Sequence, residues 1–429
     1  MQNERRVLVS AVLKLENEGY SNLILDNLLN ESELNAAQKA FVTAAFYGIV
    51  ERKISIDYIL NKFLNKPIKK APPFTSAVLR SGAYQILFLD KVPNSAAVNE
   101  AVKIIKKSKE KGNAPLVNAV LRKVCTEGLK DEVISSSNPS IRFSVEEWIY
   151  NSLCSDYSKE QIDAFLENSL LTPPVFVRIN CLKEKAYDAF VAELSSFGGS
   201  LDSTQCEDVY LASGIKGAEG LKSYQNGLFF VQDISSRLAA KALDAKPYER
   251  VLDCCAAPGG KSFSIALDMQ NKGEIISCDI HPHRVSLIEK GAKRLGLDII
   301  KPTLCDGLKY NKDLGFFDKV ICDAPCSGIG VIRRKPEIKY KSNDECLELP
   351  KLQFNILSNA ARYVKKGGRL IYSTCTLLKR ENECIVNKFL ESNPEFKPVS
   401  VFTQGESTVT FMPPQGEGDG FFIAAMERV

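Results

Sequence analysis

Apolar residues recur at helical spacing throughout the first 125 residues. The pattern runs through "RRVLVSAVLKLENEGYSNLILDNLL" and "AQKAFVTAAFYGIVERKISIDYILNKFL", and it continues in "SAVLRSGAYQILFLD", "NSAAVNEAVKIIKKSKE" and "APLVNAVLRKV". Repeats at three and four residues give a helix one apolar face. A polar stretch, "SSSNPSIRFS" (135–144), follows and has the composition of a linker. The pattern therefore predicts an all-α N-terminal domain over residues 1–130.

The period of the pattern changes after this linker. Strand-like runs at Val175 to Ile179 and Leu228 to Val231, with helical segments around them, predict a small α+β linking module over residues 141–225. Beyond residue 226, "RVLDCCA", "GEIISCD", "FDKVICDAP" and "GGRLIYSTC" are continuous apolar runs, each followed by a helical segment. Runs that are buried on both faces indicate a parallel sheet of βα units. We expect an α/β domain over residues 226–429.

Composition and charge indicate which class of partner the protein binds. With 45% hydrophobic and 25% charged residues, the chain is typical of a globular protein. The net charge of +4 divides unevenly, since residues 1–125 hold 19 Lys and Arg against 11 Asp and Glu, which is +8. The remainder is then −4. A basic N-terminal region favours a polyanionic partner such as nucleic acid. Solvated helix faces would also explain the excess of positive charge.

Other counts bear on location and metals. The N-terminus "MQNERRVLVS" lacks the apolar core of a signal peptide, and no apolar run reaches 18 residues, so we expect no membrane segment. The thirteen cysteines are odd in number and dispersed, as is typical of reduced thiols in a cytoplasmic protein. Two histidines and the absence of any CxxC predict that no metal is bound. We expect a monomer.

The stretch "DCCAAPGGKSFSIA" is a candidate ligand loop. A strand ends at Asp253, small residues follow, and a helix begins near Lys261 or Ser262, which gives a ligand close access to free backbone N–H groups. A phosphate-binding P-loop is excluded because Cys255 occupies its first glycine position, and the dinucleotide G-x-G-x-x-G is absent. An adenosyl ligand without phosphates remains, beside the alternative of a merely tight turn.

Acidic residues end the next two strand-like runs. Asp279 lies 20 residues beyond Gly259, where a carboxylate accepts hydrogen bonds from both ribose hydroxyls of a nucleoside. Asp306 follows the third run and is placed to receive an adenine amino group. Either acid could instead cap the following helix.

Two cysteines occupy the ends of further strands. Cys326 lies in "DAPCSG" and Cys375 in "YSTCT". A pyrimidine becomes nucleophilic at carbon 5 when a thiolate adds to carbon 6, and the reaction then needs an acid, here Asp323, and a base that removes the carbon 5 proton. Buried cysteines also serve simply as small apolar residues. The residues alone leave open which thiol attacks.

These segments resemble a known family. "VLDCCAAPGGKS", "DAPCSGIGVIRRKPEIKY" and "YSTCTLLKRENECIV" are similar to the signature segments of the RNA 5-methylcytosine methyltransferases, the Sun group, as are "NGLFFVQDISSRLAAKAL" and "GDGFFIAAMER". The basic helical front resembles the RNA-binding NusB-like domain of an antitermination factor. The resemblance covers nearly the whole chain. It implies a multidomain protein with a Rossmann-like class I methyltransferase domain that has a mainly parallel seven-stranded sheet.

The resemblance also implies residue roles. S-adenosylmethionine would be held by one loop and three acids, namely Cys255, Ala256, Ala257, Pro258, Gly259, Gly260 and Lys261 with Asp279, Asp306 and Asp323. Cys375 would be the nucleophile and Cys326 would assist release of the product. Asp323 would contact the ring nitrogen, with Lys261 close to the base.

The expected substrate is a cytosine in small-subunit (16S) ribosomal RNA, single-stranded or flipped out of its stack. The alternatives are a transfer RNA cytosine methyltransferase of the same group and a non-catalytic RNA-binding assembly factor. Two basic or polar clusters are candidate RNA contacts, with solvated-loop and structural roles as their alternatives: Arg333, Arg334 and Lys335 after "SGIGVI", and Arg178 and Asn180 in "VRIN".

Overall fold

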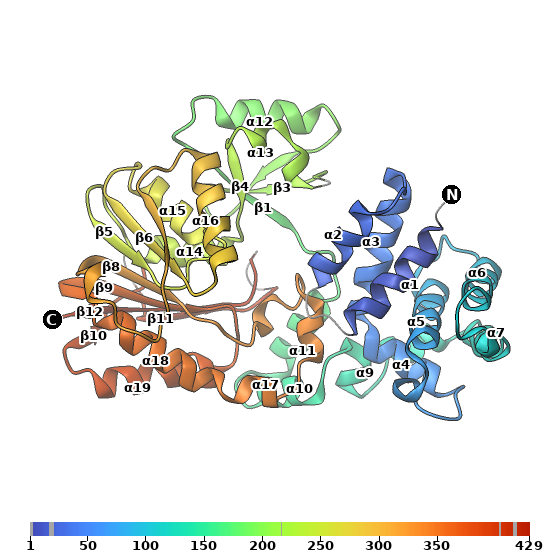
Figure 1. The fold of residues 1–429 in the computed structure, drawn as a ribbon. Coiled ribbons are helices and arrows are strands. Elements are labelled where there is room, and N and C mark those ends of the chain that lie inside the picture. The colour runs from blue at the N-terminus through green and yellow to red at the C-terminus, as the bar shows by residue number, and fades with distance from the viewer. Residues whose placement is uncertain (1–2, 17–20, 216, 403–404, 415–417) are drawn as a thin grey trace. The chain divides into compact units, whose positions relative to one another are not determined.

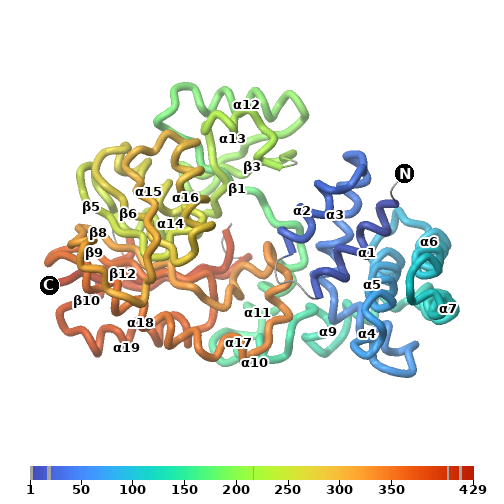
Figure 2. Tube along the Cα trace, in the orientation of Figure 1, coloured from blue at the N-terminus to red at the C-terminus, as the bar shows by residue number. Residues whose placement is uncertain are grey.

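The computed structural model describes residues 3–16, 21–215, 217–402, 405–414 and 418–429, and it groups the chain into two compact units (Figures 1 and 2). The first unit comprises Met1–Cys154 together with the short segment Arg334–Ser342. The second unit comprises Ser155–Arg333 and Asn343–Val429. No helix among the described residues is both long and apolar enough to span a membrane.

The first unit is helical, as the pattern predicts. Its central helix is α5 (Pro73–Phe88), which is buried along most of its length and packs against α1, α3, α4, α6 and α7. Gly82 lets α7 approach closely, since a Cβ there would lie 2.6 Å from Leu121. The other helices are α1 (Glu4–Leu15), α2 (Ser21–Asn30), α3 (Ala36–Glu51), α4 (Lys53–Asn61), α6 (Asn94–Lys106), α7 (Ala114–Val124), α8 (Leu129–Ile134), α9 (Pro139–Phe143) and α10 (Glu147–Cys154).

The segment Arg334–Ser342 is anchored by two side chains. The Tyr340 hydroxyl donates to the carbonyl of Val50 and accepts from the backbone N–H of Lys53 at 3.0 Å. Lys339 is fully buried, and its Nζ donates to the carbonyl of Phe143 at 3.3 Å. Burial lowers the pKa of Lys339 from 10.5 to about 7, because an ammonium is poorly solvated there. This lysine therefore opposes folding in its charged form.

We expect Lys339→Met to raise the stability of the protein in a pH-dependent way. The folded pKa lies below the unfolded pKa, so the native state of the wild type gains stability as pH rises from about 7 to about 10.5. The variant should be more stable by roughly 1–4 kcal/mol at pH 6, and this difference should shrink at pH 9.5. Thermal unfolding at both pH values tests this, with the exposed Lys335→Met as control. An equal gain in stability at pH 6 and at pH 9.5 would contradict this expectation.

The second unit begins with a small antiparallel sheet in the order β2-β3-β1-β4. Strand β1 (Val175–Ile179) is central and pairs with both β3 (Val209–Ala212) and β4 (Phe229–Val231). The ring of Phe190 stacks on that of Phe229, with centroids 4.0 Å apart. The strands expected at 175–179 and 228–231 are thus present. The remaining elements are β2 (Leu201–Ser203), α11 (Lys159–Asn168), α12 (Ala186–Ser195) and α13 (Lys222–Gln225).

A large sheet forms the rest of this unit. Its strand order is β10-β12-β9-β8-β5-β6-β7, and β11 also pairs with β12. The pairs from β9 to β7 are parallel, whereas β12 is antiparallel to its neighbours. The predicted Rossmann-like fold with a mainly parallel core is confirmed, but the described sheet has eight strands rather than the predicted seven, because β11 pairs with β12. The strands are β5 (Arg250–Asp253), β6 (Glu274–Asp279), β7 (Ile300–Leu304), β8 (Phe317–Asp323), β9 (Val364–Thr374), β10 (Phe396–Pro398), β11 (Thr408–Phe411) and β12 (Phe421–Arg428).

Helices cover both faces of this sheet (Figure 1). On one face α14 (Ile234–Ala242), α15 (Gly260–Asp268) and α16 (Pro282–Leu295) pack against Val251, Ile275 and Ile321. On the other, α18 (Leu349–Ala361) and α19 (Glu383–Ser392) pack against Leu252 and Leu370; the short α17 (Asp344–Leu347) precedes α18. Because successive strand residues enter opposite cores, the strands read as continuous apolar runs. The parallel strands end at one edge of the sheet, which carries the candidate site.

Candidate active site

The loop after β5 is compact and leads directly into a helix. Asp253 is fully buried, and its Oδ2 accepts a 2.7 Å hydrogen bond from the Ser262 hydroxyl. Burial raises the pKa of Asp253 to about 7. The helix α15 begins at Gly260, slightly before the predicted start, and Gly259 precedes it with φ +113°, a conformation that favours glycine. The backbone N–H of Ala256 donates to the Cys278 carbonyl at 2.8 Å, which ties the loop to β6.

The acids predicted at the next two strand ends lie at this same edge. Asp279 is buried; it accepts from the His281 N–H at 3.0 Å and pairs with Arg284 at 3.1 Å. Arg284 also donates to the Ala257 carbonyl at 2.9 Å, so it joins Asp279 to the β5 loop. Asp306 accepts from the Leu308 N–H at 3.0 Å, and this bond lowers the pKa of its carboxyl. Contrary to the alternative interpretation, neither carboxyl caps a helix that the structure describes: the N-cap of α16 is His281, and Asp279 and Asp306 each accept from the backbone N–H two residues further on.

The donor and acceptor chemistry of this edge fits S-adenosylmethionine. That molecule presents a sulfonium, an ammonium, two ribose hydroxyls and an adenine amino group, all of which favour carboxylate or carbonyl partners. The edge carries the carboxyls of Asp279, Asp306 and Asp323. The Oδ1 atom of Asp253 is buried and has no hydrogen-bond partner in the described part of the chain. The described residues hold no cluster of three His, Cys, Asp or Glu side chains arranged for a metal ion.

Asp323, at the end of β8, is held between two donors. Its Oδ2 accepts from Lys261 Nζ at 2.7 Å, and its Oδ1 accepts from the Ser373 hydroxyl at 2.8 Å. Burial alone lowers the pKa of Lys261, but the charge and hydrogen bond of Asp323 outweigh burial, so the pKa is raised. Lys261 is therefore a firmly protonated cation inside the site, and the negative charge on Cys375 contributes to the same shift.

The two predicted cysteines are in contact. Their Sγ atoms are 3.2 Å apart, and both side chains are half-buried. The hydrogen bond to Cys375, together with burial, raises the pKa of Cys326 well above its ordinary value. Either sulfur can donate in this contact, and the raised pKa of Cys326 favours the thiol form of Cys326. With Lys261 nearby, the contact favours the thiolate on Cys375.

Three of the candidate RNA contacts from the sequence make contacts within the fold, whereas Lys335 is exposed. The Arg333 side chain donates to the carbonyls of Leu171 and Thr172 and to Asn168. Arg178 is buried and pairs with Asp208 at 3.0 Å and Asp268 at 2.7 Å. Asn180 is fully buried and donates to the carbonyls of Gly227 and Leu295. The prediction that Arg178 and Asn180 face RNA is wrong, because both side chains are buried inside the fold.

The sequence interpretation missed several polar residues around the site. Arg284 and Ser373 hold the acids, and the fully buried Glu381, Asn382 and Gln353 surround the cysteine loops. Glu381 and Asn382 are the "EN" of "KRENE", six and seven residues after Cys375. Because their neighbours Lys379, Arg380 and Glu383 are charged as well, no local pattern in the sequence marks Glu381 and Asn382 as buried.

The comparisons with known proteins agree along the whole chain. Residues 240–427 match the family described as 16S rRNA methyltransferase RsmB/F, and residues 2–126 match the NusB family. A probable ribosomal RNA small subunit methyltransferase B from Bacillus subtilis (strain 168) is 38% identical, over 99% of this chain and 98% of its own. The chain belongs to the RsmB/F family of 16S ribosomal RNA methyltransferases. The Sun-group resemblance drawn from the sequence is confirmed.

Solved structures extend the RsmB/F assignment to the fold. The crystal structure of PH0851 aligns with a TM-score of 0.84 and 26% identity over 100% of this chain and 99% of that one. NSun6 from Pyrococcus horikoshii, with SFG, aligns with a TM-score of 0.59 and 22% identity over 66% of this chain and 98% of that one. The C-terminal fold is therefore that of a methyltransferase, with a NusB-family domain in front of it.

Proposed function

We propose that this RsmB/F family member transfers a methyl group from S-adenosylmethionine to carbon 5 of a cytosine in 16S ribosomal RNA. One observation carries the proposal: two thiols 3.2 Å apart lie at the sheet edge where Asp323 and Lys261 form a 2.7 Å ion pair. A single cysteine suffices for attack on a pyrimidine. A second thiol in contact with the first suits a reaction that must also release its product.

We assign four side chains to the reaction. The Cys375 thiolate adds to carbon 6 of the cytosine, which makes carbon 5 nucleophilic. Asp323 contacts the ring at nitrogen 3, and the Lys261 ammonium beside it carries a proton. After methylation, the proton on carbon 5 must leave before the Cys375–carbon 6 bond breaks. The carbon 5 proton passes to solvent water, its C–H electrons form the carbon 5–carbon 6 double bond, and the Cys375 sulfur leaves as a thiolate. Cys326, held as a thiol against Cys375, assists that elimination by donating a hydrogen bond to the departing sulfur.

We assign the cofactor to the same edge. When bound, S-adenosylmethionine supplies an electrophilic methyl group. The residues that would hold it are the loop from Cys255 to Lys261 and the acids Asp279, Asp306 and Asp323. Arg284 keeps Asp279 and the Ala257 carbonyl in fixed positions, so the acids do not have to reorganise on binding.

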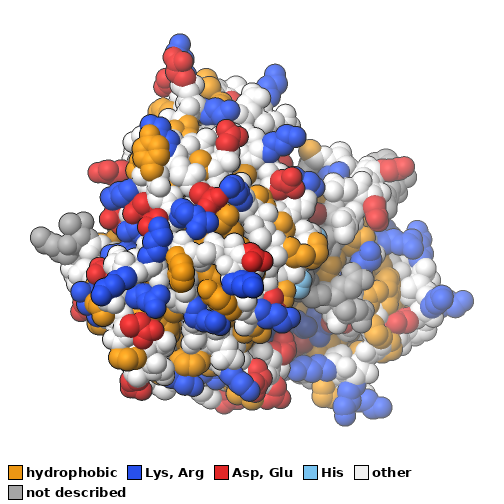
Figure 3. Space-filling view, turned by 60° about the vertical axis from the view of Figure 1, so that its left-hand side comes forward, with side chains coloured by type: hydrophobic (Ala, Val, Ile, Leu, Met, Phe, Trp, Pro, Cys, Tyr) orange, Lys and Arg blue, Asp and Glu red, His pale blue; other side chains and the backbone are white. Residues whose placement is uncertain are grey.

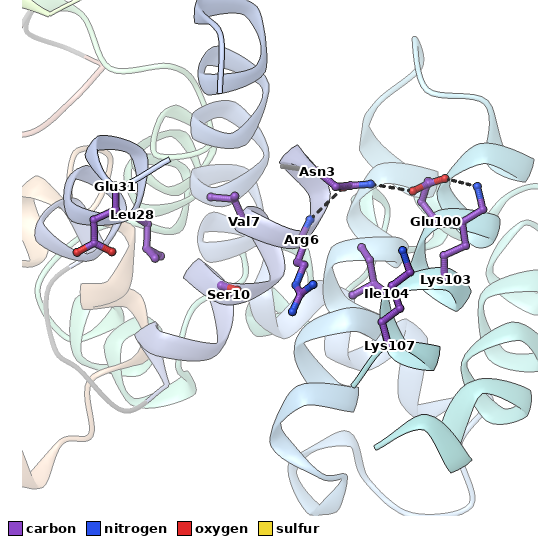
Figure 4. A pocket seen from close by; sticks show the side chains of 10 residues that line it. All are labelled: Asn3, Arg6, Val7, Ser10, Leu28, Glu31, Glu100, Lys103, Ile104 and Lys107. Atoms are coloured by element: carbon purple, nitrogen blue, oxygen red, sulfur yellow. Dashed lines mark hydrogen bonds and ion pairs between the residues drawn. The ribbon is translucent and has the colours of Figure 1, made fainter. Parts of the chain in front are cut away.

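We propose that residues 1–130 form an RNA-binding domain, that residues 141–225 form a module linking it to the catalytic domain, and that residues 226–429 catalyse methyl transfer. The first unit has a cavity of about 690 Å³ between α1, α2 and α6 (Figure 4). Arg6, Lys103 and Lys107 line it, and Glu100 binds Lys103 at 2.7 Å. None of the described residues pairs with the Arg6 guanidinium or the Lys107 amine. Figure 3, by contrast, shows basic and acidic side chains interspersed over one face of the molecule.

Arg6→Gln and Lys107→Gln should each weaken RNA binding, because both cations are free to meet phosphates. Removing one cation that binds a phosphate should reduce the slope of log affinity against log salt by about 0.7, the value for single strands. Filter binding between roughly 50 and 200 mM salt measures this slope. The exposed Lys109→Gln is the control from the same unit. Unchanged slopes in both variants would place the RNA surface elsewhere.

The proposed function is tested by methyl transfer from labelled S-adenosylmethionine to 16S ribosomal RNA and, separately, to transfer RNA. Digestion to nucleosides identifies the product. The proposal expects 5-methylcytidine from ribosomal RNA and none from transfer RNA. Label in transfer RNA only supports the transfer RNA enzyme, and RNA binding without label supports the assembly factor. Either result contradicts the proposal.

A further inference from the structure

Glu381 is a buried acid that forms no ion pair with any residue the structure describes. It is fully inaccessible to solvent, and its Oε2 accepts from the Ser327 N–H at 2.9 Å and from Gln353 Nε2 at 2.8 Å. Its Oε1 is also buried and has no hydrogen-bond partner among the residues the structure describes. Burying a carboxylate with only two neutral donors costs stability. Packing alone gives no reason for an acid at this position.

The position of Glu381 relates it to Cys326. Gln353, which donates to Glu381, also donates to the Pro325 carbonyl at 3.0 Å. The peptide groups on both sides of Cys326 are therefore fixed, Pro325 through its carbonyl and Ser327 through its N–H. Gln353 lies on α18 and Glu381 closely precedes α19, so two packed elements hold this loop.

Asn382, the next residue, holds the other cysteine in the same manner. It is fully buried; its Oδ1 accepts from the Thr374 hydroxyl at 2.6 Å, and its Nδ2 donates to the Thr376 carbonyl at 3.0 Å. Thr374 and Thr376 flank Cys375. Each of two adjacent residues thus fixes the backbone around a different thiol.

Further contacts join the two cysteine loops. The hydroxyls of Ser327 and Thr376 are 2.7 Å apart, and the Gly330 N–H donates to the Cys375 carbonyl at 3.0 Å. A Cβ on Gly330 would lie 2.0 Å from the Gly420 carbonyl oxygen, so the backbone here has no room to shift. The distance between the thiols is therefore set by the network, and Glu381 and Asn382 are its two anchors.

We propose that Glu381 and Asn382 are positioning residues with separate tasks: Glu381 holds Cys326 for release of the product, and Asn382 holds Cys375 for attack. The inference rests on the proposed function, because it uses those roles of the two thiols. The inference predicts that loss of Glu381 causes the covalent adduct to accumulate, whereas loss of Asn382 prevents the adduct from forming. The negative charge of Glu381 adds to its task, since it also raises the pKa of Cys326 and so favours the protonated thiol.

The test compares Glu381→Ala and Asn382→Ala by single-turnover methyl transfer, by multiple turnover, and by covalent protein–RNA adduct on a denaturing gel. We expect Glu381→Ala to transfer the first methyl group within about threefold of the wild-type rate, to turn over roughly 10- to 100-fold more slowly, and to accumulate adduct. Asn382→Ala should slow the first transfer by a similar factor and accumulate none. Glu381→Gln, which keeps an oxygen for the Ser327 N–H, should accumulate less adduct than Glu381→Ala.

Control variants distinguish a failure of the positioning inference from a failure of the proposed function. Accumulated adduct is a gain of signal that a misfolded variant cannot give, and the exposed Glu391→Gln on α19 should behave like the wild type. Cys326→Ala, run beside the others, tests the proposed function itself. Adduct from Cys326→Ala but none from Glu381→Ala overturns the positioning inference and leaves the proposed function intact. Identical losses in Glu381→Ala and Asn382→Ala also overturn it. No adduct from Cys326→Ala, with an inactive wild type, overturns the proposed function.

Discussion

Cys375→Ala abolishes methyl transfer, whereas Cys326→Ala accumulates a covalent complex between protein and RNA. This is the result we expect if Cys375 attacks carbon 6 and the neighbouring thiol, 3.2 Å away, assists elimination. Loss of the nucleophile should lower the rate by on the order of 10⁴-fold or more. Loss of Cys326 should leave the attack intact and stop the reaction at the adduct. A denaturing gel with labelled 16S ribosomal RNA and S-adenosylmethionine shows both outcomes.

The matched control is Cys384→Ala, since Cys384 is an exposed thiol on α19. It should methylate RNA at the wild-type rate without a shifted band. If Cys375→Ala forms the adduct and Cys326→Ala does not, the roles of the two cysteines are reversed. That outcome would contradict the assignment of the thiolate to Cys375, which rests on the Sun-group resemblance and on the contact between the two sulfurs.

Asp323→Asn should have the second largest effect, a fall in kcat of roughly 10²- to 10⁴-fold with little change in the KM for RNA. In the proposed mechanism Asp323 contacts the ring nitrogen, and in the structure it is also the partner that keeps Lys261 charged. Without that carboxylate, burial dominates and the pKa of Lys261 falls. The residual activity of the variant should therefore decline at lower pH on the alkaline side than the activity of the wild type.

A pH–rate profile of Asp323→Asn and wild type, with the exposed Asp298→Asn as control, measures both effects. An alkaline limb that does not move would mean that the protonation of Lys261 is irrelevant to the rate. A large rise in KM with unchanged kcat would make Asp323 a binding residue only.

The positions of the candidate residues in the sheet agree with the sequence prediction. Asp279, Asp323 and Cys375 were placed by one rule, that parallel strands deliver their carboxyl ends to one edge, and periodicity was enough to find those strands. The helical front was equally clear, because its apolar period extends over many turns. The start of α15 was missed by one or two residues, since the small residues of this loop give no sharp capping signal.

Other features depend on contacts that no local pattern encodes. Arg178 and Asn180 look like surface residues in the sequence, but Asp268 and the Leu295 carbonyl, far along the chain, draw them into the interior. The segment Arg334–Ser342 follows the Cys326 loop, yet it groups with the N-terminal residues through Tyr340 and Val50. Charge and hydropathy alone would place Lys339 and Glu381 on the surface, whereas the structure buries both.

The central claim is that Cys375 forms the bond to the cytosine, and trapping with 5-fluorocytosine tests it most directly. Fluorine at carbon 5 blocks the elimination, so the wild-type protein should remain bound to 16S ribosomal RNA that contains this base. Trypsin separates the two cysteines, because residues 320–333 and 370–379 lie between cleavage sites. Mass spectrometry after nuclease digestion should find the nucleotide on the 370–379 peptide, at Cys375. A nucleotide on the 320–333 peptide, or on neither, contradicts the account.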